Sequence, residues 1–465
     1  MNPELQRRIW TDVTPRRLGF LAIVLAVVLA VAWALPHPDD KVATVARTAA
    51  AIFFVLTVLW GGRNAGEAIS ADIRDRTWDL QRMSALSASS MAFGKFVGAT
   101  LFVWIGALTC VAVMAAAPAT DLLDIAIAPE GPLPQLFALW RQVGSALLAQ
   151  VAAFVAAILA MRRGVSGVRW SLVVSVGAAL AVWSLLQAAT SGFAAFRFDE
   201  RGVLEGWSTS VWWGLDITVA LFVSAIIVVY ILLGALAAVR LIRRDMLERG
   251  DGLFLGIVAV ITGVLFGGFA HEGSDTSNGL AAGIGLAAAI VIAIAWVAAI
   301  IEPKDPRRTA RTAALFWGGR IAEAVVTAPA FVVPLLAGAL ALVVFIVVGA
   351  AQGLEVAVLA LPVCVLLFAI RDIALILGFC AGERPDKGEF PALVVLALSY
   401  VALGPLVSEL ARPAAAVFWP MTDSFPGIAG PIYGLMAAAT PAILAVVWAA
   451  MRLQKRTSEP VIAQT

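Results

Sequence analysis

The sequence is poor in charge and in cysteine. Asp, Glu, Lys and Arg make up only 14% of its 465 residues, whereas 61% are hydrophobic and the mean hydropathy is +0.93. A soluble domain carries about 25% charged residues, so this composition excludes a soluble globular protein of this length. Cys110, Cys364 and Cys380 lie in or at the end of hydrophobic runs, and their spacing predicts neither a disulfide framework nor a metal site.

The sequence also lacks the residue patterns that carry catalysis. Its two histidines, His37 and His271, fall in predicted loops and form no cluster. No Gly-x-x-x-x-Gly-Lys-Ser/Thr sequence occurs, so the chain is not expected to hydrolyse ATP by itself. We therefore predict a protein that is not an enzyme, with no catalytic, metal-binding or cofactor-binding residue and no nucleic-acid partner. The polar start of the chain predicts no cleavable signal peptide.

Long hydrophobic runs dominate what is present. About twelve runs approach or exceed the roughly 20 residues that cross a bilayer as a helix, which predicts an all-α, polytopic membrane protein. The predicted spans are 18–35, 43–60, 93–117, 135–161, 169–189, 211–239, 252–270, 279–301, 325–350, 354–379, 391–411 and 430–452.

The loop lengths predict two halves of six spans each, 18–245 and 246–455, followed by a short tail at 456–465. Each half places a long cytoplasmic loop between its second and third spans, at 61–92 and 302–324. Each half also ends with a long aromatic external loop before its sixth span, and we expect these loops to dip back into the bilayer where protein covers them. The aromatic and apolar residues are Phe193, Phe196, Phe198 and Trp207 in the first loop, and Val417, Phe418, Trp419 and Phe425 in the second.

An interfacial helix is predicted within residues 1–17. Asn2 suits the N-cap and Pro3 the first turn. Leu5, Ile9 and Val13 recur at helical spacing and are expected to face lipid. The polar residues expected to face water are Glu4, Arg7, Arg8, Thr11 and Asp12.

The distribution of Lys and Arg predicts the orientation of the chain. With a cytoplasmic N-terminus, the external side holds only Lys41, Arg47, Arg141, Arg197, Arg201 and Arg412. Arg371 lies within the tenth span, and all other Lys and Arg fall on the cytoplasmic side. This asymmetry predicts a multi-pass protein of the inner (plasma) membrane with both termini in the cytoplasm.

The first cytoplasmic loop contains a polar stretch from Asp72 to Met83. Ile69, Ile73, Leu80 and Met83 recur at helical spacing, so we expect one apolar and one charged helical face. Read on its own, the stretch is either a docking surface for a soluble partner or a solvated face that finishes a long second helix.

The first hundred residues resemble the permease subunits of type-2 ABC exporters. In that family a surface helix and two spans precede a loop of the form acidic-basic-x-Thr-x-acidic-Leu, a Pro-Leu-Ser turn and Gly-Lys. Arg76 stands where the family often has glycine, and Ala85 where it often has proline. The matching residues are Asp75, Thr77, Asp79, Leu80, Leu86, Ser87, Gly94 and Lys95, and Asn2-Pro3-Glu4-Leu5 resembles the family's start.

The resemblance implies that this loop is a coupling helix, which docks on a separate ABC ATPase subunit and passes its motion to the spans. ATP and Mg²⁺ would then bind to the partner and not to this chain. We expect Trp78, Leu80 and Met83 to fill a groove on the partner while nearby charges orient the contact. The predicted coupling residues are Asp75, Arg76, Thr77, Trp78, Asp79, Leu80, Arg82 and Met83.

The second cytoplasmic loop lacks the Thr-x-acidic-Leu and Gly-Lys pattern. Its layout still suggests a second ATPase contact, whereas its basic run fits pairing with anionic lipid equally well. The residues in question are Arg307, Arg308, Arg311 and Trp317.

Two features lie within the predicted spans. Arg371 and Asp372 are interpreted as a local ion pair toward the inner end of the tenth span, where Arg371 can extend to the interface. Small residues four apart predict close helix packing. These pairs are Gly94/Gly98, Gly263/Gly267 and Gly279/Gly283.

The leading hypothesis is the permease of an ATP-driven exporter, acting as one chain or as a pair of copies in the lipid bilayer. The alternative is an ion-coupled secondary transporter of twelve spans. A membrane-embedded enzyme or a scaffold is a third interpretation, and the lack of clustered polar residues speaks against the enzyme.

Overall fold

A computed structural model describes residues 2–35, 41–75, 77–83, 86–116, 132–162, 173–184, 196–198, 204–207, 209–246, 253–271, 279–302, 305–382, 385–421 and 428–458. The chain divides into two compact units. The N-terminal unit comprises Met1–Thr209 and Ile217–Arg249, and the C-terminal unit comprises Ser210–Asp216 and Gly250–Thr465.

The protein is an all-α, polytopic membrane protein. Within the described residues, 10 helices are long and apolar enough to cross a bilayer. The fifth and seventh predicted spans coincide with shorter apolar helices, Val173–Ser184 and Leu253–Gly267. Helices suit this environment because each one satisfies its own backbone hydrogen bonds where lipid offers no partners.

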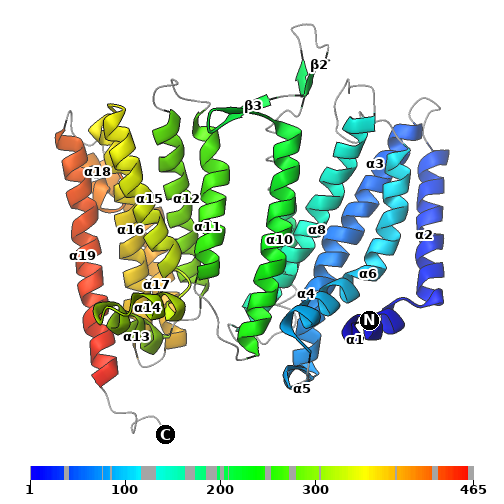
Figure 1. The fold of residues 1–465 in the computed structure, drawn as a ribbon, viewed down its shortest axis with the longest axis horizontal. Helices are drawn as coiled ribbons and strands as arrows, with labels where there is room; N and C mark the ends of the chain where they lie inside the picture. Colours follow the sequence, from blue (N-terminus) through cyan, green and yellow to red (C-terminus); the bar gives the residue numbers. More distant parts are fainter. Residues whose placement is uncertain are drawn as a thin grey trace. The chain divides into compact units, whose positions relative to one another are not determined.

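The N-terminal unit contains one interfacial helix and a bundle of membrane helices (Figure 1). Its helices are α1 (Pro3–Asp12), α2 (Pro15–Ala34), α3 (Lys41–Phe54), the π-helix η2 (Val55–Trp60), α4 (Gly61–Arg74), α5 (Trp78–Arg82), α6 (Ala88–Ala115), α8 (Pro132–Arg162), Val173–Ser184 and α10 (Val219–Asp245). Its strands are β1 (Phe196–Phe198) and β2 (Leu204–Trp207).

One buried cluster holds this bundle together, with members on α2, α3, α4, α6, α8 and α10. Phe53 and Phe154 are among its largest fully buried side chains. The helix α2 instead exposes large apolar side chains such as Phe20 and Ile23, as expected of a lipid-facing span. The predicted N-terminal surface helix is present as α1, which lies across the lower end of the bundle (Figure 1).

The second span changes pitch at η2, and a polar network stands beside this change. The Gln150 side chain donates to the carbonyl of Thr57 at 2.9 Å, and Trp104 donates to Gln150 at 2.9 Å. Gln150 and Thr57 are fully buried. A buried amide of this kind is tolerated in lipid because its hydrogen bonds are satisfied within the protein.

The segment before α10 differs from the prediction of a span over 211–239. Residues 209–218 form the hairpin β3 (Thr209–Trp212) and β4 (Leu215–Thr218), and the helix begins only at Val219. Trp213 and Gly214 adopt positive φ angles of 50° and 79°, which suit a two-residue hairpin turn. The β1–β2 ribbon projects beyond the upper ends of the N-terminal unit's helices (Figure 1), and most of the loop predicted to dip, Phe193 included, lies outside the described residues.

The C-terminal unit is likewise a bundle of membrane helices with shorter helices at one end (Figure 1). Its helices are α11 (Leu253–Gly267), η3 (Gly268–His271), α12 (Gly279–Ile301), α13 (Pro306–Trp317), α14 (Ile321–Thr327), α15 (Val332–Ala351), α16 (Val356–Cys380), α17 (Pro385–Ala397), the π-helix η4 (Leu398–Leu403), α18 (Gly404–Leu410), η5 (Arg412–Val417) and α19 (Ala429–Ser458).

Glycines set the contact between α11 and α12, as the predicted Gly263/Gly267 pair requires. A Cβ at Gly267 would lie 2.6 Å from the carbonyl oxygen of Gly283, and one at Gly263 would lie 2.8 Å from that of Ala287. Backbone oxygens cannot move away as a flexible side chain can, so only glycine permits this approach.

The predicted inward dip occurs in the C-terminal unit. After α18, the short helix η5 returns toward the bundle, and the carbonyl of Val417 accepts a hydrogen bond from Arg371 at 3.1 Å. Trp419 then donates to the carbonyl of Tyr400 at 3.2 Å, within η4. These two hydrogen bonds tie the segment to α16 and η4, while Val417 itself stays 36% exposed.

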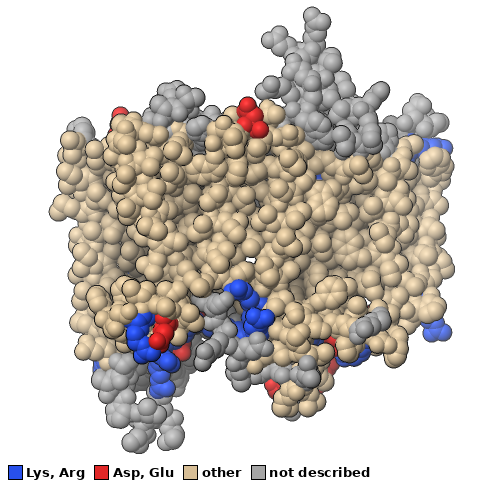
Figure 2. All heavy atoms as spheres, viewed as in Figure 1, with Lys and Arg blue, Asp and Glu red and all other residues tan. Residues whose placement is uncertain are grey.

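Charge on the face shown in Figure 2 gathers at the ends of the helices and not along their flanks. Within the C-terminal unit, a group of basic and acidic side chains lies over α13 and α14 (Figure 2). This distribution matches a bilayer, where charged side chains are costly in the hydrocarbon and favourable at the headgroups.

Candidate functional site

The predicted coupling stretch folds as two helices joined by a sharp corner. The helix α4 ends at Arg74, and α5 starts at Trp78. Thr77 makes the corner, because its N–H donates to the Asp72 carbonyl at 2.8 Å and its hydroxyl donates to the same oxygen at 3.2 Å. The expectation of one continuous apolar face from Ile69 to Met83 is therefore wrong, since Thr77 diverts the backbone into a turn.

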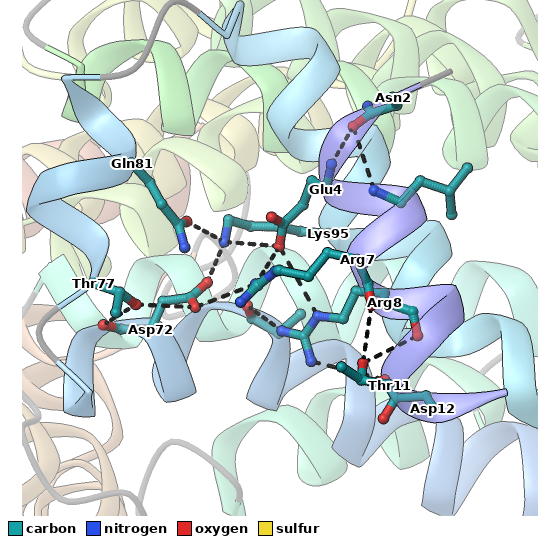
Figure 3. Close-up of polar contacts among 12 residues, drawn as sticks. Asn2, Glu4, Arg7, Arg8, Thr11, Asp12, Asp72, Thr77, Gln81 and Lys95 are labelled. Carbon is teal, nitrogen blue, oxygen red and sulfur yellow. Dashed lines mark hydrogen bonds and ion pairs between the residues drawn. The ribbon is translucent and has the colours of Figure 1, made fainter. Parts of the chain in front are cut away.

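Lys95 is the centre of a buried polar cluster at this corner (Figure 3). Its side chain comes from α6 and is fully buried. It forms a short hydrogen-bonded ion pair with Asp72 of α4, donates to Gln81 of α5 at 2.6 Å, and lies 3.6 Å from Glu4 of α1. One ammonium group thereby joins four helices.

The helix α1 completes the cluster from the other side. Its N-cap residue Asn2 accepts from the N–H of Glu4 at 3.0 Å and donates to the Ser90 carbonyl of α6 at 2.5 Å. Arg7 pairs with Glu4 at 2.7 Å and lies 3.7 Å from Asp72 (Figure 3). The expectation that Glu4 faces water is wrong, because this side chain is buried against Lys95.

Close approach of α1 and α6 depends on the predicted Gly94/Gly98 pair. A Cβ at Gly94 would lie 2.8 Å from the Asn2 side-chain oxygen, and one at Gly98 would lie 2.7 Å from the Arg8 Cβ. Arg8 also donates to the Ala68 carbonyl at 3.4 Å, so it packs on the protein and does not face water as predicted. The pair confirms close helix packing at this contact.

The cluster balances its charges. Asp72, Glu4 and Asp12 carry three negative charges, and Lys95, Arg7 and Arg8 carry three positive ones, which offsets the cost of burying Lys95. The hydrogen bond to Glu4 and the negative charges of Glu4 and Asp72 raise the pKa of Arg7 above its usual value, although burial opposes this. The site is therefore a set of fixed ion pairs.

The outer surface of α5 and its flanks is open. Leu80 is 66% exposed and Met83 is 77% exposed, and Asp75 and Asp79 are exposed as well. Trp78 instead points inward with only 8% exposed, and its ring lies 5.5 Å from the Lys95 ammonium. The expectation that Trp78 fills a groove on a partner is wrong, because the ring packs inside its own unit.

Two predicted coupling residues lie wholly or partly outside the described residues. Arg76 lies outside the described residues, and Arg82 ends α5 while its side chain lies outside them. In Figure 1, α5 projects beyond the lower ends of the neighbouring helices of its unit. The predicted site thus keeps an exposed apolar tip, Leu80 and Met83, on an anchored base.

The second predicted docking loop, 302–324, is built differently. Arg308 is held inside it: the guanidinium donates to Thr327 and Ala328 carbonyls at 2.8 and 2.6 Å and pairs with Glu302 at 2.9 Å. A docking role for Arg308 is therefore excluded by its own contacts. Arg307 and Arg311 are exposed, and Trp317 is 85% exposed.

A second buried ion pair lies within α16. Arg371 and Asp372 pair at 2.8 Å and are 5% and 2% exposed. Tyr400 and Trp296 donate to Asp372 at 2.7 and 3.1 Å. The predicted local ion pair is present, but Arg371 does not extend to the end of α16, because its guanidinium donates to the Val417 carbonyl at 3.1 Å.

Sequence reasoning missed the roles of Glu4, Gln81 and Tyr400. Glu4 and Gln81 are ordinary polar residues of short helices, and only their contacts with Lys95 distinguish them. A usable signal was the Gly94/Gly98 pair beside Lys95, which predicted that another helix approaches there. Among the described residues, no three His, Cys, Asp or Glu side chains gather as metal ligands would.

No family model, curated protein or solved structure matches this chain.

Proposed function

We propose that the chain is the membrane-spanning permease subunit of an ATP-driven exporter, and that α5 docks on a separate ATPase subunit. The observation that carries this proposal is the combination of an exposed tip and an anchored base at α5. Leu80 and Met83 offer apolar surface to a partner. Lys95 ties the same short helix to the membrane helix α6 through Gln81.

This construction suits the transfer of force. Apolar side chains surrounded by charge are typical anchors of a protein contact, and acidic neighbours such as Asp75 and Asp79 add orientation. A push on α5 reaches α4 and α6 together, because Lys95 holds Asp72 and Gln81 at once. The helix α1 shares these ion pairs, so it moves with the same group.

The orientation that this role requires places α1 and α5 in the cytoplasm and the chain in the plasma membrane. The positive-inside distribution of Lys and Arg supports that orientation. The ATPase is expected to carry the Gly-x-x-x-x-Gly-Lys-Ser/Thr sequence that this chain lacks, and to bind the ATP and Mg²⁺.

The test is affinity purification of the full chain in mild detergent from cells that make both proteins. We expect a nucleotide-hydrolysing protein to co-purify with the natural chain. Leu80→Glu/Met83→Glu should reduce its recovery at least tenfold, because anchor residues contribute about 2 kcal/mol or more each. Ser89→Glu is the matched control, since Ser89 is an exposed residue at the nearby start of α6.

The unfolding temperature of both variants is a second readout. Both variants should unfold at the temperature of the natural chain, because the changed side chains are exposed. Equal recovery of the ATPase with Leu80→Glu/Met83→Glu and the natural chain would contradict the proposal. Loss with Ser89→Glu as well would point to general charge and not to the α5 tip.

Arg371 and Asp372 favour a second candidate, an ion-coupled secondary transporter. Ionisable groups within membrane helices mark ion pathways in many transporters, and both of these are buried in α16. In vesicles, transport that needs no nucleotide and stops when the proton or sodium gradient is collapsed would favour this candidate. Transport that requires ATP and survives collapse of the gradient would favour the exporter.

A further inference from the structure

The helix α13 is fixed to the C-terminal unit by hydrogen bonds of Asp305, Arg308 and Glu302, called the α13 bracket below. Asp305 caps its first turn, accepting from Arg307 and Arg308 N–H groups at 3.0 and 3.3 Å. Arg308 bonds to Glu302 and to the backbone after α14, and the other Glu302 oxygen accepts from the Ala330 N–H at 2.5 Å. The orientation of α13 is therefore set by the protein before any partner arrives.

The α13 bracket decides which face of α13 remains outside. At 100° per residue, Arg308, Thr312 and Leu315 share one side, and these residues are at least partly buried. Arg311 and Arg307 lie on one flank of this side, about 60° and 100° from Arg308, and Ala313 and Trp317 lie opposite it, about 140° and 180° from Arg308. One exposed face thus has a cationic edge beside an apolar edge.

The cationic edge is not neutralised from within. Among the described residues, Arg307 and Arg311 have no acidic partner within ion-pair distance, whereas the nearby Arg320 pairs with Glu323. The apolar edge is equally uncovered, because Trp317 is 85% exposed and makes an edge contact with Phe316. A helix that exposes two such cations and an indole suits a partner that offers both an anion and an apolar contact.

The position of α13 at the end of the membrane helices allows a single phospholipid to supply both the anion and the apolar contact. Figure 1 shows α13 and α14 near the lower ends of α15 and α16 and beside the lower part of α19. Charged side chains appear over the same region in Figure 2. A helix at this level meets phosphate headgroups and acyl chains together, and tryptophan is enriched at this depth of a bilayer.

We propose that the exposed face of α13 binds anionic phospholipid, with Arg307 and Arg311 on the headgroup phosphates and Trp317 in the upper acyl region. This contact seats the C-terminal unit on the anionic leaflet. It replaces the second ATPase contact expected from the loop layout and does not depend on docking at α5. Each Arg near an anionic membrane surface contributes about 1 kcal/mol, or about fivefold in affinity. Two together therefore raise the affinity about 30-fold.

The test is native mass spectrometry of the purified full chain, titrated with phosphatidylglycerol or with phosphatidylcholine in detergent. The natural chain should bind phosphatidylglycerol more tightly than phosphatidylcholine. Arg307→Gln/Arg311→Gln should weaken phosphatidylglycerol binding about 30-fold and leave phosphatidylcholine binding unchanged. Trp317→Ala should weaken the binding of both lipids, because it removes the apolar contact.

Arg320→Gln is the matched control, since Arg320 is an exposed arginine of the same loop that has its own carboxylate partner. Its phosphatidylglycerol binding should stay within twofold of the natural chain. An equal loss with Arg320→Gln would overturn the proposal in favour of unspecific charge. So would unchanged lipid binding by Arg307→Gln/Arg311→Gln, and loss of a co-purifying ATPase with that variant would then assign the face to the ATPase.

Discussion

The two buried ion clusters of this protein use the same charges in opposite settings. The Lys95 cluster lies where α1, α4, α5 and α6 meet, and one member, Arg7, keeps about half of its side chain exposed. The Arg371–Asp372 pair lies inside α16 and is almost fully enclosed. Both clusters balance positive and negative charge and both bury their central pair, so the difference lies in the half-exposed Arg7 at the edge of the first.

This difference teaches what each cluster is suited to do. The Lys95 cluster holds α5, whose outer surface is open, so a force applied from outside the unit reaches the membrane helices through it. The Arg371–Asp372 pair holds the inward-dipping segment at Val417 and has no open surface. The first cluster lies behind an exposed helix, and the second ties an inward-dipping segment to the bundle.

The largest expected loss of stability comes from breaking the enclosed Arg371–Asp372 pair. Arg371→Met leaves Asp372 buried without its opposite charge, which should lower the free energy of unfolding by about 3–5 kcal/mol. Denaturant or thermal unfolding of the purified chain in detergent measures this. Arg371→Met/Asp372→Asn should recover much of the loss, because no charge is then stranded. A double variant no more stable than the single one would show that lost packing, not charge, was responsible.

A smaller effect is expected at the open cluster. Lys95→Met leaves Asp72 and Glu4 without their ammonium partner, but Arg7 stays close to both carboxylates and water is near. We expect a loss of about 1–3 kcal/mol in the free energy of unfolding, measured in the same detergent. Adding Asp72→Asn should restore part of it. A loss as large as that of Arg371→Met would contradict the contrast in water access.

The smallest expected loss of stability comes from disturbing the packing of α1 on α6 without changing any charge. Gly94→Val places side-chain atoms where Asn2 and Glu4 now lie, so α1 must shift, at a cost of about 1–3 kcal/mol or less. Gly19→Val in α2 is the control, because no atom lies within 4 Å of a Cβ at Gly19. Unfolding measurements should separate the two variants, and equal stabilities would show that α1 does not need this close approach.

The sequence predicted the membrane helices well and the clusters poorly, for a physical reason. Hydrophobic length alone marks a span, because lipid imposes the same requirement on every helix. A charged residue such as Glu4 or Lys95 carries no local mark of burial. Its environment comes from residues far along the chain, as in the hydrogen bond from Asn2 to Ser90.

Trp78 and Arg308 show the same limit at the predicted docking loops. An aromatic or basic residue in a polar loop looks available to a partner, but Trp78 packs beside Lys95 and Arg308 binds backbone carbonyls. Leu80 and Met83 kept the exposure expected of them because the corner at Thr77 turns α5 outward. Nothing in the helical spacing of the apolar residues forecast that corner.

The π-helical turn η2 makes residue number as important as residue type in the second span. It stands between the outer part of that span and α4, which carries Asp72 toward Lys95. Forcing α-helical pitch on the six residues Val55–Trp60 without removing any of them would rotate everything beyond by about 100°. Asp72 would then swing away from α6, although the hydrophobicity of the span would be unchanged. The direction in which this protein's polar corner points is set, in effect, by counting.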